Sequence, residues 1–217
     1  MNTTQLQSTT NDTLVIESTV RRVLVEKRAG FDLEAQSLKK DLIESLHIDT
    51  IENIRVLNRY DVEDLSEEVF ENAAKTIFSE TNLDVVYYNE LEDINENDRV
   101  FAIEYLPGQY DQRGDWAAQC IQIVNEGKRP NISTAKVYVL SGNISDIDFD
   151  RIKSYCINPV DSREASLEIP KTLEMEIEVP TSVAILDGFI DFSAEELETF
   201  LKKQGLAMTL ADLEHVQ

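Results

Sequence analysis

The stretch that decides the fold is Arg99–Val124, RVFAIEYLPGQYDQRGDWAAQCIQIV. Its first part predicts a strand, because it is rich in β-branched and aromatic residues and ends at Pro107-Gly108. Its second part predicts a helix with one apolar face, made of Trp116, Cys120, Ile121, Ile123 and Val124. Either Asp111 or Asp115 is expected to cap this helix, since a short carboxylate accepts hydrogen bonds from the free N–H groups of a first turn.

A polar turn, Tyr105–Arg113, lies between the predicted strand and helix. We call it the elbow. It is rich in groups that form hydrogen bonds, and it is the best candidate for a contact surface. A purely structural turn is the plainer interpretation, and the stretch by itself names no reaction.

Working outward, the same order of elements occurs twice. Strands are expected at 19–27, 51–59, 83–88, 100–105 and 134–140, and helices at 32–46, 66–78, 111–125 and 145–156. The two halves, 19–88 and 99–165, align at an offset of 78 or 79, or 81 for Val56 with Val137. The aligned pairs are Glu26 with Glu104, Gly30 with Gly108, Leu38 with Trp116, Ile43 with Ile121, Val56 with Val137, and Ser66 with Ser145. We therefore predict an α+β fold with a duplicated strand–helix–strand–helix–strand module, a mainly antiparallel sheet and a local two-fold axis.

Composition limits the possible partners. The 217 residues are 42% hydrophobic and 29% charged, which is typical of a globular chain. The net charge of −22 argues against nucleic acid and anionic membranes, which are bound through Lys and Arg. No apolar run reaches the roughly 20 residues that span a bilayer. High solubility explains this charge most simply, and docking to a basic partner is the more specific alternative.

The two ends of the chain differ from its middle. Residues 1–18 are predicted to be a flexible leader without the features of a secretion signal, and the two cysteines suggest a reducing cytoplasm. Residues 166–217 are predicted to form a linker domain. Within it Pro170 and Pro180 enclose an alternating, extended segment, and a helix runs from a Ser193–Glu196 capping box to Gly205.

A last helix is expected from Thr209. Four apolar residues near it are expected to lack partners, as in a fragment of a larger protein: Leu206, Met208, Leu210 and Leu213.

Few residues suggest catalysis. His47 and His215 have no second ligand at metal-binding spacing, and Cys120 and Cys156 are expected to be buried, inert thiols. There is no glycine-rich phosphate loop and no serine nucleophile motif. Glu26 and Glu104, at matched strand positions, are either turned outward or an acid–base pair. We expect no catalytic, cofactor-binding or metal-binding residue.

Several stretches resemble the N-terminal region of the large, single-chain phosphoribosylformylglycinamidine synthase. They are Glu104–Arg113 with Ala117–Cys120, Val56–Val62, Val137–Gly142, Ile157–Val160 with Arg163-Glu164, and Gly205–Met208 with Asp212-Leu213. Gly114-Asp115-Trp116 is a small departure. The resemblance covers nearly all of residues 20–217.

The resemblance implies a cytoplasmic, ATP- and Mg²⁺-dependent ligase of purine biosynthesis, a glutamine amidotransferase that converts formylglycinamide ribonucleotide to its amidine. It also implies that this part of the enzyme contains two fused PurS-like copies and a hydrophilic linker domain, which contact the synthase and glutaminase domains. Within residues 166–217, Gly205–Met208 with Asp212-Leu213 resembles the start of the synthase domain. The family's active sites lie beyond Gln217, so this chain alone is expected to be an inactive scaffold. The candidate interface comprises Tyr105, Leu106, Pro107, Gly108, Gln109, Tyr110, Asp111, Arg113, Asn158, Pro159 and Arg163.

Two alternatives remain open at this point. One is a ferredoxin-like or ACT-like sensor domain that binds a small molecule between the two halves, which rests on analogy of fold alone. The other is a free-standing enzyme that uses Glu26 and Glu104.

Overall fold

A computed structural model of the chain describes residues 20–174 and 185–217. The chain divides into two compact units, residues 1–174 and 175–217. The predicted leader, residues 1–18, and residues 175–179 of the alternating segment lie outside the described residues.

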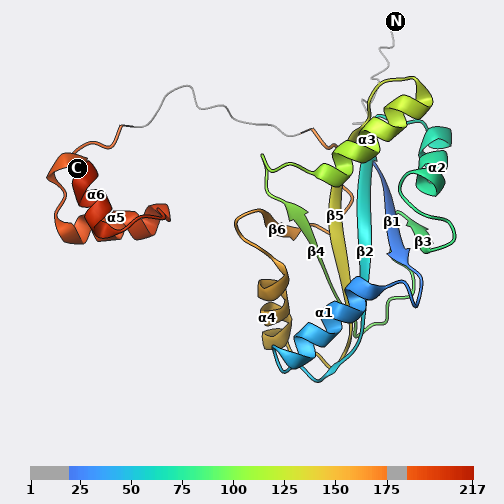
Figure 1. The fold of residues 1–217 in the computed structure, drawn as a ribbon, viewed down its shortest axis with the longest axis horizontal. Coiled ribbons are helices and arrows are strands. Elements are labelled where there is room, and N and C mark those ends of the chain that lie inside the picture. The colour runs from blue at the N-terminus through green and yellow to red at the C-terminus, as the bar shows by residue number, and fades with distance from the viewer. Residues whose placement is uncertain (1–19, 175–184) are drawn as a thin grey trace, which may run out of the picture. The chain divides into compact units, whose positions relative to one another are not determined.

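The described part of the first unit forms a six-stranded sheet in which every pairing is antiparallel (Figure 1). Its strands are β1 (Arg21–Lys27), β2 (Ile51–Glu63), β3 (Asp84–Tyr88), β4 (Arg99–Tyr105), β5 (Asn131–Gly142) and β6 (Ser162–Ala165). Their order across the sheet is β3-β1-β2-β5-β4-β6. The predicted α+β class with a mainly antiparallel sheet is confirmed.

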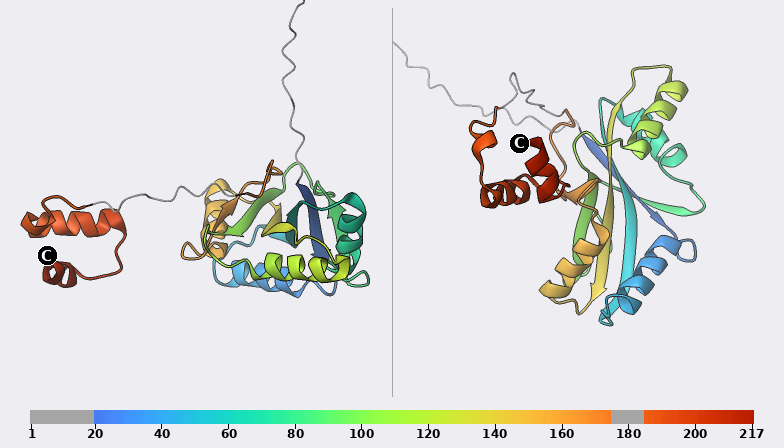
Figure 2. Two further views of the ribbon diagram at one scale, coloured as in Figure 1. Left: turned by 90° about the horizontal axis from the view of Figure 1, so that it is seen from above. Right: turned by 60° about the vertical axis from the view of Figure 1, so that its left-hand side comes forward.

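The helices of this unit pack on one face of the sheet, which we call the helix face (Figure 2). They are α1 (Leu33–Glu44), α2 (Glu67–Thr76), α3 (Gln112–Asn125) and α4 (Asp146–Cys156). Helices α1 and α4 share a core around Leu42, Phe101 and Ile152, whereas α2 and α3 share a core around Phe70 and Ile121. Each pair therefore combines one helix from either half of the sequence.

Local capping explains where three of these helices begin. The side chains of Ser66, Asp111 and Ser145 each accept a hydrogen bond from the third backbone N–H that follows them. Asp111, and not Asp115, is thus the cap of α3.

The two central strands are longer than predicted. Strand β2 continues to Glu63 instead of Arg59, and β5 runs from Asn131 to Gly142 instead of 134–140. The reason is that Arg59, Asp61 and Glu63 alternate along β2, so their charged side chains all point to the face opposite the helices, where ion pairs accommodate them.

The strand pairings of the two halves are related by a constant difference in residue number. The pair Val23–Tyr60 in β1–β2 corresponds to Phe101–Tyr138 in β4–β5, and both residues differ by 78. The pairings of β1 with β3 and of β4 with β6 differ by 78 as well. In the central β2–β5 pairing, Asn58 and Lys136 lie opposite each other and are also 78 apart.

The helices follow an offset of 79, which corrects two of the predicted residue matches. Buried Leu42 of α1 corresponds to buried Ile121 of α3, so matching Leu38 with Trp116 and Ile43 with Ile121 is wrong by one residue. Val56 and Val137 lie on opposite faces of the sheet, so their match is wrong too.

The pattern of buried residues in α3 shows that its predicted apolar face is wrong. The residues of this helix that are buried are Gly114, Ala117, Ala118 and Ile121. Of the predicted face only Ile121 is buried, while the other four side chains are exposed. Small residues let α3 lie close to the sheet and α2, and the larger apolar residues occupy its outer side.

The described part of the second unit contains η1 (Phe189–Asp191), α5 (Ala194–Gln204) and α6 (Leu210–Val216). The rings of Phe189, Phe192 and Phe200 pack together with centroids 5.6–6.2 Å apart. The Ser193–Glu196 capping box and the left-handed Gly205, at φ 63°, confirm the predicted start and end of α5. Leu213 is buried, contrary to the expectation that it lacks partners.

None of the helices in the described residues is both long enough and apolar enough to cross a membrane.

Candidate functional site

The elbow lies at the end of β4, beside the loop that follows α4. The backbone N–H of Leu106 donates a hydrogen bond to the carbonyl of Asp161, at 2.9 Å. This contact places the elbow next to Asn158 and Pro159, so two separate parts of the predicted interface meet. Gly108, at the tip of the elbow, has a φ of +89°, which glycine adopts without strain.

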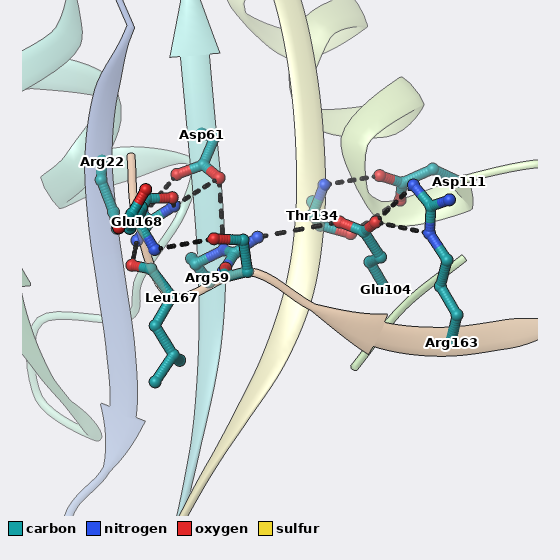
Figure 3. Close-up of polar contacts among 10 residues, drawn as sticks. Arg22, Arg59, Asp61, Glu104, Asp111, Thr134, Arg163, Leu167 and Glu168 are labelled. Atoms are coloured by element: carbon teal, nitrogen blue, oxygen red, sulfur yellow. Dashed lines mark hydrogen bonds and ion pairs between the residues drawn. The ribbon is translucent and has the colours of Figure 1, made fainter. Parts of the chain in front are cut away.

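Asp111 anchors the elbow to the sheet. Its carboxylate caps α3 at the N–H of Gly114 (2.9 Å) and accepts two further bonds from Thr134 of β5, from the backbone N–H (2.7 Å) and the hydroxyl (2.8 Å; Figure 3). A charged acceptor with three short hydrogen bonds is a strong local constraint. The start of α3 is thereby fixed on β5.

Tyr105 and Arg113 line two adjacent hollows on the helix face. The first has a volume of about 320 Å³ and includes Lys136, Asn158 and Ser162 in its wall. The second, of about 410 Å³, lies between the two halves of the sequence. Its wall comprises Tyr60, Ile77, Tyr105, Gln112, Arg113, Trp116, Ala117 and Cys120.

Arg113 also reaches the buried hydroxyl of Tyr60. Burial raises the pKa of Tyr60, and the positive charge and hydrogen bond of Arg113 partly oppose that rise. Tyr60 stacks on Phe78 with ring centroids 4.6 Å apart. Arg113 is thus held over the junction between the halves, at the base of the elbow.

A chain of charges lies behind the elbow, on the face of the sheet opposite the helices (Figure 3). Arg22 forms a bidentate pair with Asp61, at 2.6 and 2.9 Å, and Arg59 lies 3.2 Å from the same carboxylate. Arg163 contacts Glu104 at 2.8 Å, and Arg59 lies 3.9 Å from Glu104. We call Arg22, Arg59, Asp61, Glu104 and Arg163 the charge row.

The two buried arginines of the charge row also hold a passing backbone segment. Arg59 donates to the carbonyl of Ser166 at 2.7 Å, and Arg22 donates to those of Leu167 and Glu168 at 2.6 and 3.0 Å. Desolvation by burial lowers the pKa of Arg59, and the nearby Asp61 carboxylate opposes this. Contacts with carboxylate and carbonyl oxygens thus replace the hydrogen bonds to water that the two arginines lose on burial.

Glu26 and Glu104 point to this same face but are not brought together. Glu26 pairs with Arg55 at 2.7 Å and accepts a bond from the hydroxyl of Tyr87, whereas Glu104 pairs with Arg163. They stand on β1 and β4, which β2 and β5 separate. Three strand spacings amount to about 14 Å, too far for both carboxylates to act on one bond.

The expectation that both cysteines are buried is wrong for Cys120, whose side chain is exposed on α3. Cys156 is partly buried, and burial raises the pKa of its thiol to about 11.

We expect iodoacetamide at pH 8 to modify Cys120 at least tenfold faster than Cys156. Alkylation requires a thiolate, and a pKa of about 11 leaves about one Cys156 thiol in a thousand ionised at pH 8. The rate at Cys156 should rise about tenfold per pH unit up to its pKa. Mass spectrometry of quenched samples measures both rates, and equal labelling at pH 8 would contradict the burial of Cys156.

The charge row was not predicted as a site, although the sequence carries a signal for it. Charged residues at every second position of a strand, as in Arg59-Tyr60-Asp61-Val62-Glu63, indicate one charged face. Within the described residues, no group of three or more His, Cys, Asp or Glu side chains is arranged to hold a metal ion.

No protein-family model and no curated protein matches this chain.

Proposed function

We propose that this chain is the non-catalytic docking module of a phosphoribosylformylglycinamidine synthase. In this proposal it holds the synthase and glutaminase domains of the enzyme in register, so that ammonia released from glutamine passes between them without escaping into water. The ATP- and Mg²⁺-dependent chemistry takes place beyond Gln217, as the resemblance implies, and the residues of this chain position the partner domains.

The single observation that carries the proposal is that the elbow is exposed and yet rigidly anchored. Tyr105 and Tyr110 are 47% and 64% exposed. Asp111, which follows Tyr110 and directly precedes α3, is fixed by its hydrogen bonds with Gly114 and Thr134. Exposed aromatic side chains on a preorganised backbone are typical of binding surfaces, because little conformational entropy is lost on docking. The elbow belongs to a stretch that resembles the family, and its anchored backbone with exposed tyrosines supports a docking role.

The strand pairings support the proposed PurS-like duplication. Both pairings between neighbouring strands within one half recur in the other at an offset of 78, and equivalent residues such as Val23 and Phe101 lie on the same face of the sheet. A local two-fold axis would pass through the Asn58–Lys136 pair, where equivalent residues lie opposite each other. In this reading, the chain is a dimer of two similar modules joined covalently.

The test supplies the synthase–glutaminase part of a family enzyme as a separate chain and measures amidine formed per glutamine hydrolysed. Adding the present chain should raise this ratio toward one. The double variant Tyr105→Ala/Tyr110→Ala should lower the gain at least tenfold, because these rings form the exposed part of the elbow. Tyr155→Ala, at an exposed tyrosine on α4, is the matched control.

Three results would contradict the proposal: no gain with the unaltered chain, an unchanged gain with the elbow variant, or turnover of ATP or glutamine by the isolated chain. A rise of several degrees in its Tm with a purine nucleotide or amino acid alone would favour the sensor instead, with the hollow between the halves as its site.

A further inference from the structure

Helix α3 carries an apolar stripe on its exposed side, formed by Trp116, Cys120, Ile123 and Val124. These residues are spaced i, i+4, i+7 and i+8, so they lie along one side of the helix. The exposed fractions of the three large side chains are 60% for Trp116, 76% for Ile123 and 65% for Val124. A run of this kind on a surface helix is unusual in a monomeric protein and marks an interaction site.

The matching helix of the other half shows that folding does not require this stripe. Helix α1 covers the same face of the sheet, and at the offset of 79 its equivalent residues are Ser37, Asp41, Glu44 and Ser45. All four are exposed and polar. Two helices in equivalent structural positions therefore differ on the side that faces solvent, and the apolar character of α3 has another cause.

The stripe is continuous with the elbow. Trp116 and Cys120 form part of the wall of the hollow between the halves, together with Tyr105 and Arg113 of the elbow. A partner that covers the elbow would thus extend naturally along α3. The hollow provides a concave feature beside the convex stripe, which adds complementarity of shape.

We propose that the α3 stripe is the apolar centre of the docking surface and that it seats against an apolar groove with a basic rim on the synthase–glutaminase part of the enzyme. This inference rests on the proposed function and specifies its partner surface. The basic rim follows from charge: the chain carries −22, and α2, which packs beside α3, exposes Glu67, Glu68 and Glu71.

A second copy of this chain is a poorer occupant. Two chains of charge −22 repel each other. A stable protein interface buries about 800 Å² on each partner, which is more than four side chains on one helix supply. The stripe is therefore suited to be one part of a larger interface.

The test measures the affinity of the full chain for the separately produced synthase–glutaminase part by biolayer interferometry. The variant Trp116→Gln/Ile123→Gln/Val124→Gln should bind at least 30-fold more weakly, because it removes the apolar centre and leaves the elbow intact. The control Ser37→Gln/Glu44→Gln/Ser45→Gln changes the equivalent residues of α1 and should bind within twofold of the unaltered chain. Raising the salt concentration from 50 to 500 mM should weaken binding of the unaltered chain at least fivefold.

Each outcome separates the two proposals. If the stripe variant binds as tightly as the unaltered chain, this inference is wrong and the docking function stands. If the unaltered chain does not bind, both fail. If sedimentation shows a dimer of the unaltered chain that the stripe variant abolishes, the occupant is a second copy and the inference is wrong. An unchanged Tm of both triple variants verifies that they fold.

Discussion

Replacing Asp61 with Asn should lower the free energy of unfolding by about 3–5 kcal/mol, the usual cost of leaving buried charges without their partner. Asp61 is 2% exposed and pairs with two arginines, each 4% exposed. The substitution keeps the size of the side chain, so it isolates the effect of charge. Arg22 and Arg59 would then be buried without their shared carboxylate, and Glu104 would remain 3.9 Å from Arg59.

Urea unfolding at pH 7, followed by circular dichroism, measures this loss. Asp64→Asn is the matched control, because Asp64 pairs with Lys128 at 2.7 Å on the surface, with half of its side chain exposed. Exposed pairs contribute little, so the control should lose less than about 1 kcal/mol. Asn also tolerates the left-handed backbone of Asp64, at φ 64°. Equal losses in the two variants would show that the charge row is not an interior ion pair network.

The second large effect is expected at Gly142, the last residue of β5. Its φ is +132°, and a Cβ atom there would lie 2.1 Å from the carbonyl oxygen of Thr50. Since the Cβ position is fixed by the backbone and the atom that it meets is a backbone oxygen, only movement of β5 or of the turn before β2 would relieve the overlap. Gly142→Ala should therefore cost about 3 kcal/mol or more, the sum of unfavourable φ and overpacking.

Gly30→Ala separates the two contributions. Gly30 also has a positive φ, +89°, but no atom lies within 4 Å of where its Cβ would be. This control retains the backbone strain without the overlap and should cost about 1–2 kcal/mol. Thermal unfolding of both variants compares their stabilities. If Gly142→Ala is as stable as Gly30→Ala, strands β2 and β5 separate at this end with little loss of stability.

Local signals in the sequence predicted most of the elements. Ser66, Ser145 and Ser193 mark helix starts and Gly205 marks a helix end, and the structure confirms each of them. These features depend on hydrogen bonds between residues a few positions apart, so they can be read without knowing the tertiary structure.

The buried side of α3 could not be predicted in this way. Apolar periodicity assigned the inner side to Trp116 and Ile123, whereas Ala117 and Ala118 occupy it. Alanine has a high helix propensity on the buried and on the exposed side of a helix, so the presence of Ala117 and Ala118 does not indicate which side is buried. What decides the matter is the distance between α3 and its neighbours, which only the packed structure defines.

The charge row was missed for a related reason. Arg22, Arg59 and Asp61 look like surface residues in the sequence, because isolated charges are almost never fully buried. Their burial follows from pairing between β1 and β2, which places Arg22 directly opposite Asp61. The elbow, by contrast, was located from its sequence, although the contacts of Asp111 with Thr134 that fix it join residues 23 positions apart.

Arg22 and Arg59 donate hydrogen bonds to the carbonyl oxygens of Ser166, Leu167 and Glu168. These bonds have an evolutionary consequence. Every residue type presents the same main-chain oxygen, so these three positions are free to drift in sequence while the chain keeps its path over the sheet. Selection at this crossing should act on the two guanidinium groups, and divergent homologues should retain them even where residues 166–168 share no identity.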